Sequence, residues 1–114
     1  ERRGITSVMD EALQIVSNGT DGVHVSFDVD SMDPKEITGT GTPVPGGLTY
    51  RESQLLLRIL AEANVVTSAE FVEVNPLLDH KNRTAEVTVS LIKALLGEKL
   101  TNSFQTSKMV EAPR

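Results

Sequence analysis

The sequence predicts an α/β fold whose elements follow one another as helix, strand, helix, strand, helix. Three observations predict it: apolar residues recur at helical spacing in three segments, two short apolar runs between them have strand character, and glycine- or proline-rich turns separate them. Strands separated by a helix are expected to pair in parallel. We expect part of a larger domain, because the chain opens on Glu1 and its first strand has the character of one strand in a larger sheet.

The first helix is predicted over residues 5–16, with Ser7 and Asp10 arranged as a capping box. A turn at residues 18–22 ends it. The first strand is then predicted from residue 23 to residue 29, with one apolar and one polar face. The polar face carries His24, Ser26, Asp28 and Asp30.

A proline- and glycine-rich loop follows over residues 31–48, and a loop of that length inside a compact domain is usually functional. The second helix opens with a capping box at residues 49–52 and continues to about residue 63. The second strand is predicted over residues 65–74 and the last helix over residues 82–96. The buried side of the second helix is expected to carry Leu55, Leu56, Ile59 and Leu60.

Composition excludes several classes of function. The net charge of −5 argues against a nucleic-acid or anionic-membrane surface. No apolar run approaches the ~20 residues that a membrane span needs, and no signal peptide opens the chain, so we expect a soluble, cytoplasmic protein. The absence of cysteine excludes disulfides, zinc–thiolate sites and thiol nucleophiles.

The first strand ends in a cluster of acidic residues. Asp28 and Asp30 are expected on the same side of the strand, where two carboxylates can chelate Mg²⁺ or Mn²⁺. The alternative is a solvated strand end whose acids cap the following turn. For Asp33, which precedes a proline, we predict the turn.

The second strand also ends in an acid, Glu73. Parallel pairing would bring it to the same rim of the sheet as the aspartates, where it could hold a cationic group such as a guanidinium. An ordinary ion pair or cap is the alternative. In the loop, Thr40 and Thr42 could place hydroxyls near a ligand, whereas His24 is predicted to be a buried core residue and His80 to be exposed.

Three sequence blocks follow one another along the chain: Ser26–Asp30 with Asp33-Pro34, Gly39–Pro43 through Gly46–Glu52, and Glu73–Pro76. In this order and spacing they resemble the carboxyl-terminal part of the ureohydrolases, a superfamily that includes arginases, agmatinases and formiminoglutamases. The resemblance covers most of residues 4–100, so we expect residues 1–100 to be the C-terminal part of an arginase-like domain and residues 101–114 to be a tail, flexible or in contact with another subunit. Within the superfamily, Asn75 is like arginases, whereas agmatinases usually carry serine there.

The resemblance implies a three-layer α/β/α fold around a mostly parallel sheet, and two Mn²⁺ ions per active site. Asp28 would bridge both ions and Asp30 would chelate one, while Glu73 would face the substrate guanidinium with Thr42 beside it. A metal-bridging hydroxide would hydrolyse L-arginine to L-ornithine and urea, with no catalytic residue beyond the metal and substrate ligands. The family also assembles as trimers or hexamers, with Arg51 and Glu52 in an intersubunit contact; a solvated helix end is the alternative for this pair.

The other family ligands lie in Gly-Gly-Asp-His and Asp-Ala-His-x-Asp stretches that this sequence lacks. We therefore expect the chain alone to be inactive. Agmatinase, or another enzyme for guanidino substrates, is an alternative function of the parent protein. A non-catalytic oligomerisation fragment is another. Asp-x-Asp after a strand also resembles haloacid-dehalogenase-type phosphatases, but no later acidic pair follows in a suitable strand.

Overall fold

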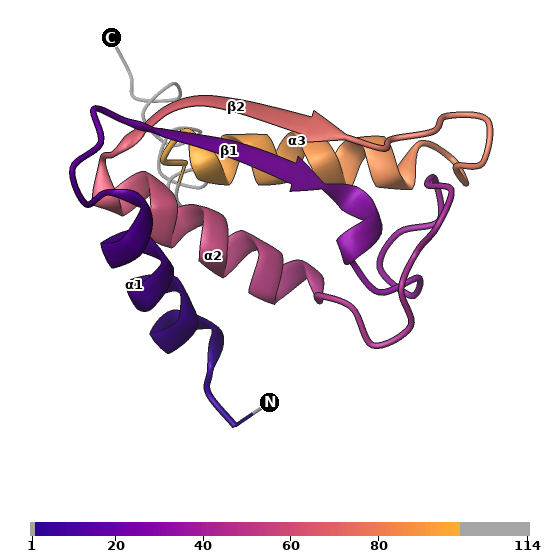
Figure 1. Ribbon diagram of the computed structural model, residues 1–114. Coiled ribbons are helices and arrows are strands. Elements are labelled where there is room, and N and C mark those ends of the chain that lie inside the picture. The colour runs from indigo at the N-terminus through magenta and orange to yellow at the C-terminus, as the bar shows by residue number, and fades with distance from the viewer. Residues whose placement is uncertain (1, 99–114) are drawn as a thin grey trace, which may run out of the picture.

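The computed structural model describes residues 2–98, and the predicted tail at residues 101–114 lies outside them. The predicted order of helices and strands is confirmed, with one short 3-10 helix added after the first strand (Figure 1). The elements are α1 (Ile5–Val16), β1 (Val23–Asp28), the 3-10 helix η1 (Val29–Ser31), α2 (Tyr50–Ala63), β2 (Val66–Val72) and α3 (Arg83–Leu95).

The two strands pair in parallel, as predicted. In the register, Phe27 lies opposite Phe71 and Asp28 lies opposite Val72. Both strands therefore end at the same edge of the sheet, next to the long loops (Figure 1). Side chains that follow the carboxyl ends of the two strands can therefore meet at this edge.

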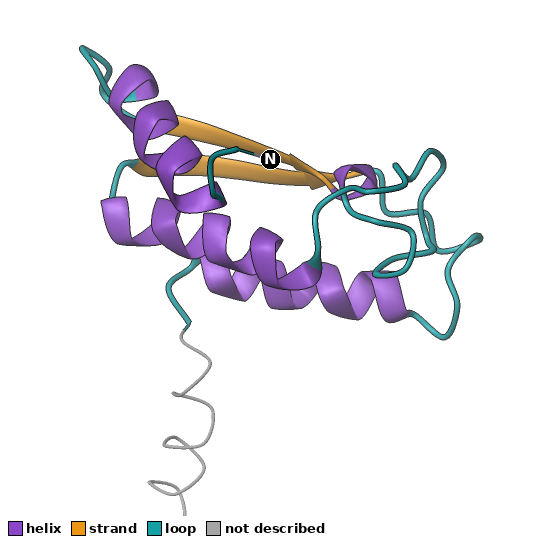
Figure 2. Cartoon of the chain, turned by 90° about the horizontal axis from the view of Figure 1, so that it is seen from below, coloured by secondary structure: helices purple, strands orange, loops and turns teal. Residues whose placement is uncertain are grey.

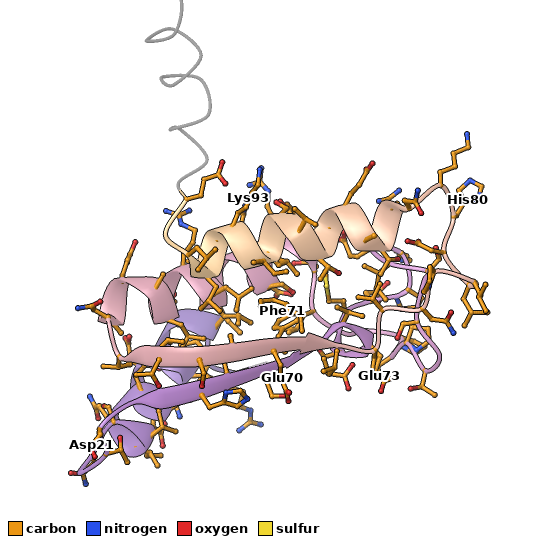
Figure 3. All side chains as sticks on the ribbon, turned by 90° about the horizontal axis from the view of Figure 1, so that it is seen from above. Asp21, Glu70, Phe71, Glu73, His80 and Lys93 are labelled. Atoms are coloured by element: carbon orange, nitrogen blue, oxygen red, sulfur yellow. The ribbon has the colours of Figure 1, made fainter. Side chains whose placement is uncertain are left out.

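The core lies between one face of this sheet and the helices α2 and α3, which run side by side along it (Figure 2). Leu57 of α2 and Leu91 of α3 are completely buried. The rings of Phe27 and Phe71 pack at 5.5 Å between centroids. Phe71 points towards the helices, whereas Glu70 points away from them (Figure 3). Burial of these aliphatic and aromatic side chains fixes which face of each strand turns inward.

The start of α2 follows the prediction. The Thr49 hydroxyl accepts a hydrogen bond from the Glu52 amide, and the Glu52 carboxylate accepts one from the Thr49 amide. On the predicted buried side, however, Leu55 is exposed and Leu57 takes the central core position. The helix is rotated so that Leu57 and Leu60, three residues apart, face the sheet.

The predicted capping box of α1 is wrong. The helix spans residues 5–16, as predicted, but Gly4 occupies the N-cap position and no side chain caps the helix. Ser7 therefore lies inside the first turn, where its hydroxyl accepts a hydrogen bond from the Arg3 guanidinium at 3.1 Å. None of the residues of α1 is fully buried, although Met9 and Leu13 pack against the core.

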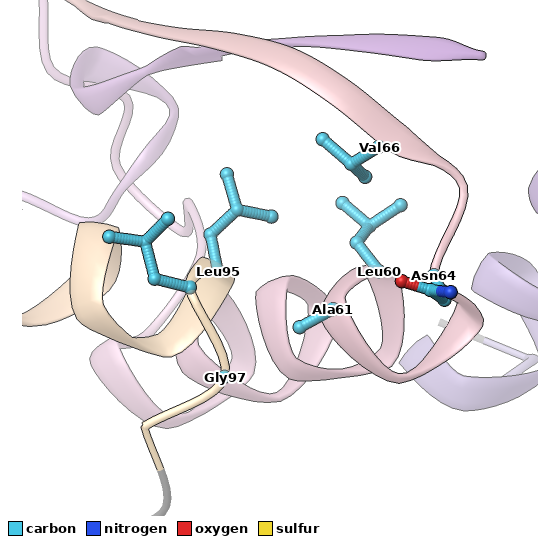
Figure 4. A pocket seen from close by; sticks show the side chains of 7 residues that line it. Leu60, Ala61, Asn64, Val66, Leu95 and Gly97 are labelled. Atoms are coloured by element: carbon cyan, nitrogen blue, oxygen red, sulfur yellow. The ribbon is translucent and has the colours of Figure 1, made fainter.

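The opposite end of the sheet has a different character. A hollow of about 180 Å³ opens there between α2, the start of β2 and the end of α3 (Figure 4). It is lined by Leu60, Ala61, Asn64, Val66, Leu95, Leu96 and Gly97. Because none of these side chains titrates, this hollow is not the candidate reaction site. Within residues 2–98, no helix has the length and apolar character to cross a membrane.

Candidate metal and substrate site

The Asp28–Asp30 pair is held by a turn, not by a continued strand. Strand β1 ends at Asp28, one residue before the predicted end, and residues 29–31 form η1. The Asp28 carboxylate accepts a hydrogen bond from the Asp30 amide at 3.0 Å, and the Ser31 hydroxyl donates to the Asp28 carbonyl at 2.7 Å. The prediction that Asp30 continues the polar face of the strand is therefore wrong, because Asp28 caps the turn with its own side chain.

The two carboxyl groups nevertheless remain coupled. Burial raises the pKa of Asp28, the Asp30 amide opposes that rise, and the Asp30 carboxyl raises it further through a hydrogen bond and its negative charge. A cation placed between the two groups would reverse the effect of burial and of the like charge.

Thr42 joins this pair from the loop. Its hydroxyl donates to the Asp30 carboxylate at 2.6 Å. This hydrogen bond orients one Asp30 oxygen and places the Thr42 side chain at the carboxyl edge of the sheet. Thr40, the other hydroxyl considered in the loop, is buried, and its hydroxyl has no hydrogen-bond partner among the described residues.

The loop that carries Thr42 is closed at its base by Asp33. The two carboxylate oxygens of Asp33 accept hydrogen bonds from the amides of Lys35 and Gly46, each at 2.8 Å. These two hydrogen bonds hold the pKa of Asp33 below its ordinary value. Met32 also pairs with Leu48 in an isolated parallel bridge. The turn predicted for Asp33 is confirmed, and the loop is ordered from both ends.

Glu73 reaches the same edge from β2. Since Val72 lies opposite Asp28, Glu73 is the first residue beyond the paired strand ends (Figure 3). Strand β2 stops at Val72 rather than at the predicted residue 74 because Glu73 adopts a left-handed backbone, with φ of 69°. Its carboxylate is exposed, with no hydrogen-bond or ion-pair partner within residues 2–98. It is available to bind a cationic group.

The two histidines lie away from these acids. His80 is exposed, as predicted. His24 is not a buried core residue: its side chain is about half exposed, with Nδ1 2.7 Å from the Ser68 hydroxyl and Nε2 3.9 Å from the Glu70 carboxylate. Its face of the sheet is uncovered among the described residues, which is why a polar position on β1 turns outward here.

Sequence reasoning missed two residues that organise the neighbourhood of Glu73. The carboxylate of Asp79 accepts hydrogen bonds from the amides of Thr84 and Ala85 at the start of α3. The Thr84 hydroxyl in turn accepts from amides of the loop before Thr42. An acid a few residues before a predicted helix was the available signal for Asp79, whereas nothing in the sequence alone pointed to Thr84.

The donor types suit a hard divalent cation, because Asp28 and Asp30 offer carboxylate oxygens at one strand end. Their number does not complete a site. Among residues 2–98, no group of three or more histidine, cysteine, aspartate or glutamate side chains is placed to hold a metal ion. Within residues 2–98, Asp28 and Asp30 would therefore be only part of a ligand set.

Comparison with the sequences of known proteins identifies the family of this chain. The family model described as "Arginase family" matches residues 1–97. The arginase of Bacillus caldovelox is 57% identical over 100 residues, which are 88% of this chain and 33% of that protein. The arginase of Bacillus subtilis is 53% identical over 88% of this chain and 33% of its own length. The chain thus spans about a third of the curated relatives that it matches.

Solved structures give the same result. The native arginase structure from Bacillus caldovelox superposes with a TM-score of 0.83, covering 87% of this chain and 33% of that one, at 57% identity. The Entamoeba histolytica arginase in complex with L-ornithine has a TM-score of 0.78 at 31% identity, over 85% of this chain and 32% of the other. The fold is therefore a fragment of the arginase α/β fold. With a family model matching residues 1–97, the chain belongs to the arginase family.

Proposed function

We propose that this chain is the C-terminal part of a manganese-dependent ureohydrolase that hydrolyses L-arginine to L-ornithine and urea. One observation carries the proposal: Asp28 at the end of β1 with Asp30 in the turn after it, and Glu73 after β2, which has no partner within residues 2–98, lie at the same edge of a parallel sheet. That edge combines hard-cation ligands with an acid for a cationic substrate. Membership of the arginase family supports the reaction class.

Each residue has a distinct part in this proposal. Asp28 and Asp30 would hold manganese, and Thr42 would keep one Asp30 oxygen oriented through its 2.6 Å hydrogen bond. Bound manganese supplies the activation of water for attack on the guanidinium carbon. Glu73 would bind and orient the guanidinium, because a carboxylate and a guanidinium form paired, charge-assisted hydrogen bonds.

The choice of L-arginine over agmatine or another guanidine is the finer part of the proposal. The relatives above are named arginases, and one was solved with L-ornithine, whereas formimidoylglutamase from Bacillus subtilis shares 28% identity at a TM-score of 0.79. The Asn75 side chain supports arginine as the substrate only through its effect on the backbone after Glu73. Its side-chain oxygen accepts from the Leu77 amide at 3.0 Å, so it shapes the turn after Glu73.

Full-length protein tests the metal role. Asp28→Ala should lose bound manganese and urea release together, while Asp21→Ala, the same change at an exposed acid at the other end of β1, should keep both. Unchanged manganese content in the Asp28→Ala protein would refute the metal role. The substrate role of Glu73 is tested by Glu73→Gln, which should keep manganese and weaken the binding of arginine.

We also propose that the 114-residue chain alone lacks arginase activity, because Asp28 and Asp30 cannot by themselves fix two cations. Urea release by the purified chain is measured with added Mn²⁺ and L-arginine. Manganese-dependent release above that of the Asp28→Ala chain would show that the ligand set within this chain is sufficient.

Assembly as a homo-oligomer, a trimer or a hexamer, belongs to the same proposal, with Arg51 and Glu52 at the contact. Both side chains are exposed at the start of α2. The Glu52 carboxylate is already bound to the amide and hydroxyl of Thr49. Of the two side chains, Arg51 therefore has its charged group available for a contact between subunits. Arg51→Ala should reduce the mass measured by light scattering. An unchanged mass would remove Arg51 from the contact.

A further inference from the structure

Thr84 connects helix α3 to the loop that carries Thr42. Its side chain is completely buried at the start of the helix. The Thr84 hydroxyl oxygen accepts hydrogen bonds from two consecutive loop amides, Gly39 at 2.8 Å and Thr38 at 3.1 Å. A single buried oxygen thus satisfies two backbone donors, of which the Gly39 amide is buried and would otherwise be unpaired there, while Thr38 is an exposed residue.

Asp79 fixes Thr84 from the other side. Its carboxylate accepts from the Thr84 amide at 3.0 Å and from the Ala85 amide at 3.2 Å. Gly39 packs directly on Asp79: a Cβ atom on Gly39 would lie 2.6 Å from the Asp79 Cβ atom. The loop backbone therefore lies against Asp79, in the segment just before α3, at a distance that only glycine allows.

The same stretch of loop also contacts the segment after Glu73. The Asn75 amide donates to the Gly39 carbonyl at 2.7 Å. Gly39 is three residues before Thr42, and Asn75 is two residues after Glu73. One residue, Gly39, is consequently held by α3 through its amide and holds the segment after Glu73 through its carbonyl.

We propose that Thr84 is a positioning residue, which fixes the Thr42–Asp30 pair relative to Glu73 by anchoring the backbone at Thr38 and Gly39. It touches neither acid, and it acts through the loop. The effect on catalysis rests on the proposed function, whereas the anchoring itself does not. If Thr84 only filled space in the core, valine, which has nearly the same shape, would replace it without effect.

Three variants separate these roles. Thr84→Val keeps the shape and removes the acceptor, while Thr84→Ser keeps the acceptor. Thr88→Val is the matched control: Thr88 is buried one turn later in α3, and its hydroxyl donates only to the Thr84 carbonyl within the helix. If Thr84→Val does not fold, Gly39→Ala tests the same anchor from the loop side, because its Cβ would displace the loop from Asp79.

The first measurement is hydrogen exchange in the 114-residue chain, which needs no metal or substrate. In Thr84→Val we expect the amides of Thr38, Gly39 and Asn75 to exchange about tenfold faster, as the loss of one hydrogen bond implies. The amides of the β1–β2 ladder should be unchanged, and Thr84→Ser and Thr88→Val should resemble the wild type. Unchanged exchange at the three amides, or equally faster exchange throughout, would overturn the anchoring.

The second measurement is the kinetics of the full-length, manganese-loaded protein with L-arginine. Thr84→Val should lower kcat/KM about tenfold, and Thr84→Ser should restore it to within about threefold. Thr88→Val should leave it unchanged. Equal losses in Thr84→Val and Thr88→Val would reduce Thr84 to a structural role. If the wild type hydrolyses no arginine at all, the proposed function fails, and the exchange measurement still decides the anchoring.

Discussion

Gly47 lies against the backbone that follows Asp30, and adding one methyl group there should be costly. An alanine Cβ at this position would lie 2.5 Å from the Ser31 carbonyl oxygen, 2.8 Å from the Met32 carbonyl carbon and 2.9 Å from the Asp33 amide nitrogen. All three are backbone atoms. They are tied in place because Leu48 donates to Ser31 at 2.9 Å and accepts from Asp33 at 3.0 Å.

The magnitude follows from these contacts. Overpacking in a well-packed region costs about 1–3 kcal/mol, and we expect Gly47→Ala near the upper end, at about 3 kcal/mol, because no flexible side chain can move aside. With a urea m-value of about 2 kcal/mol/M, the denaturation midpoint should fall by about 1.5 M. Any relief must move Ser31, and with it the adjoining Asp30. The full-length variant should therefore also bind manganese more weakly.

Equilibrium urea denaturation, followed by circular dichroism, measures the change. Gly41→Ala is the matched control in the same loop: its Cβ would have no atom within 4 Å, and its φ is not left-handed. We expect this control to stay within about 0.5 kcal/mol of the wild type. A Gly47→Ala midpoint equal to that of Gly41→Ala would refute the reasoning, since it would mean that the Ser31–Asp33 backbone can yield without cost.

Three further predictions concern the residues around this loop. Because Glu73 has a left-handed backbone, Glu73→Gly should raise the free energy of unfolding by up to about 1 kcal/mol relative to Glu73→Ala, although both lack the carboxylate; equal stabilities by urea denaturation would contradict the strain. Partial burial alone would raise the pKa of Asp79, but hydrogen bonds from Thr84, Ala85 and His80 outweigh it and lower that pKa. The ionised Asp79 carboxylate therefore stabilises the folded state fully above its unfolded pKa of about 4, and this stabilisation is lost as the pH falls through the lower folded pKa. The stability of Asp79→Asn should therefore fall less on acidification than that of the wild type, and parallel curves would exclude this source. Thr49→Ala should cost about 1 kcal/mol by loss of the α2 cap; a cost below about 0.3 kcal/mol would show that water replaces it.

The elements were predictable where a local signal and tertiary packing agree. Helix α2 is the clearest case, because its capping box and apolar spacing both point to the observed start. At α1 the predicted bounds are confirmed but the capping box is not: Ser7 and Asp10 have the residue types of a cap, whereas Gly4 occupies the N-cap position. A capping pattern identifies residue types that are able to cap a helix, whereas the position of the helix start determines which residue caps it.

Asp30 and His24 show where periodicity stopped being informative. Alternation along β1 placed both on one polar face, yet Asp28 uses its carboxylate to turn the chain, so Asp30 comes from η1. The expected burial of His24 required a layer over that face, and the described residues contain none. Each error arose because a local pattern carries no information on the hydrogen bonds or neighbours that complete it.

At the carboxyl edge of the sheet (the rim), the hydrogen bonds that shape the loops are distinct from the side chains that would bind a metal. The hydrogen bonds that shape it all lie within this chain: Asp33 closes the loop, Gly39 joins it to Asn75, and Thr84 anchors it to α3. A chain that spans a third of its relatives therefore contains the hydrogen bonds that shape this edge of its sheet. Within residues 2–98, burial and the neighbouring Asp30 raise the pKa of Asp28, and no third histidine, cysteine, aspartate or glutamate joins the pair to hold a metal ion. In the proposed function, a cation and ligands from the rest of the protein would join carboxylates that these hydrogen bonds help to position.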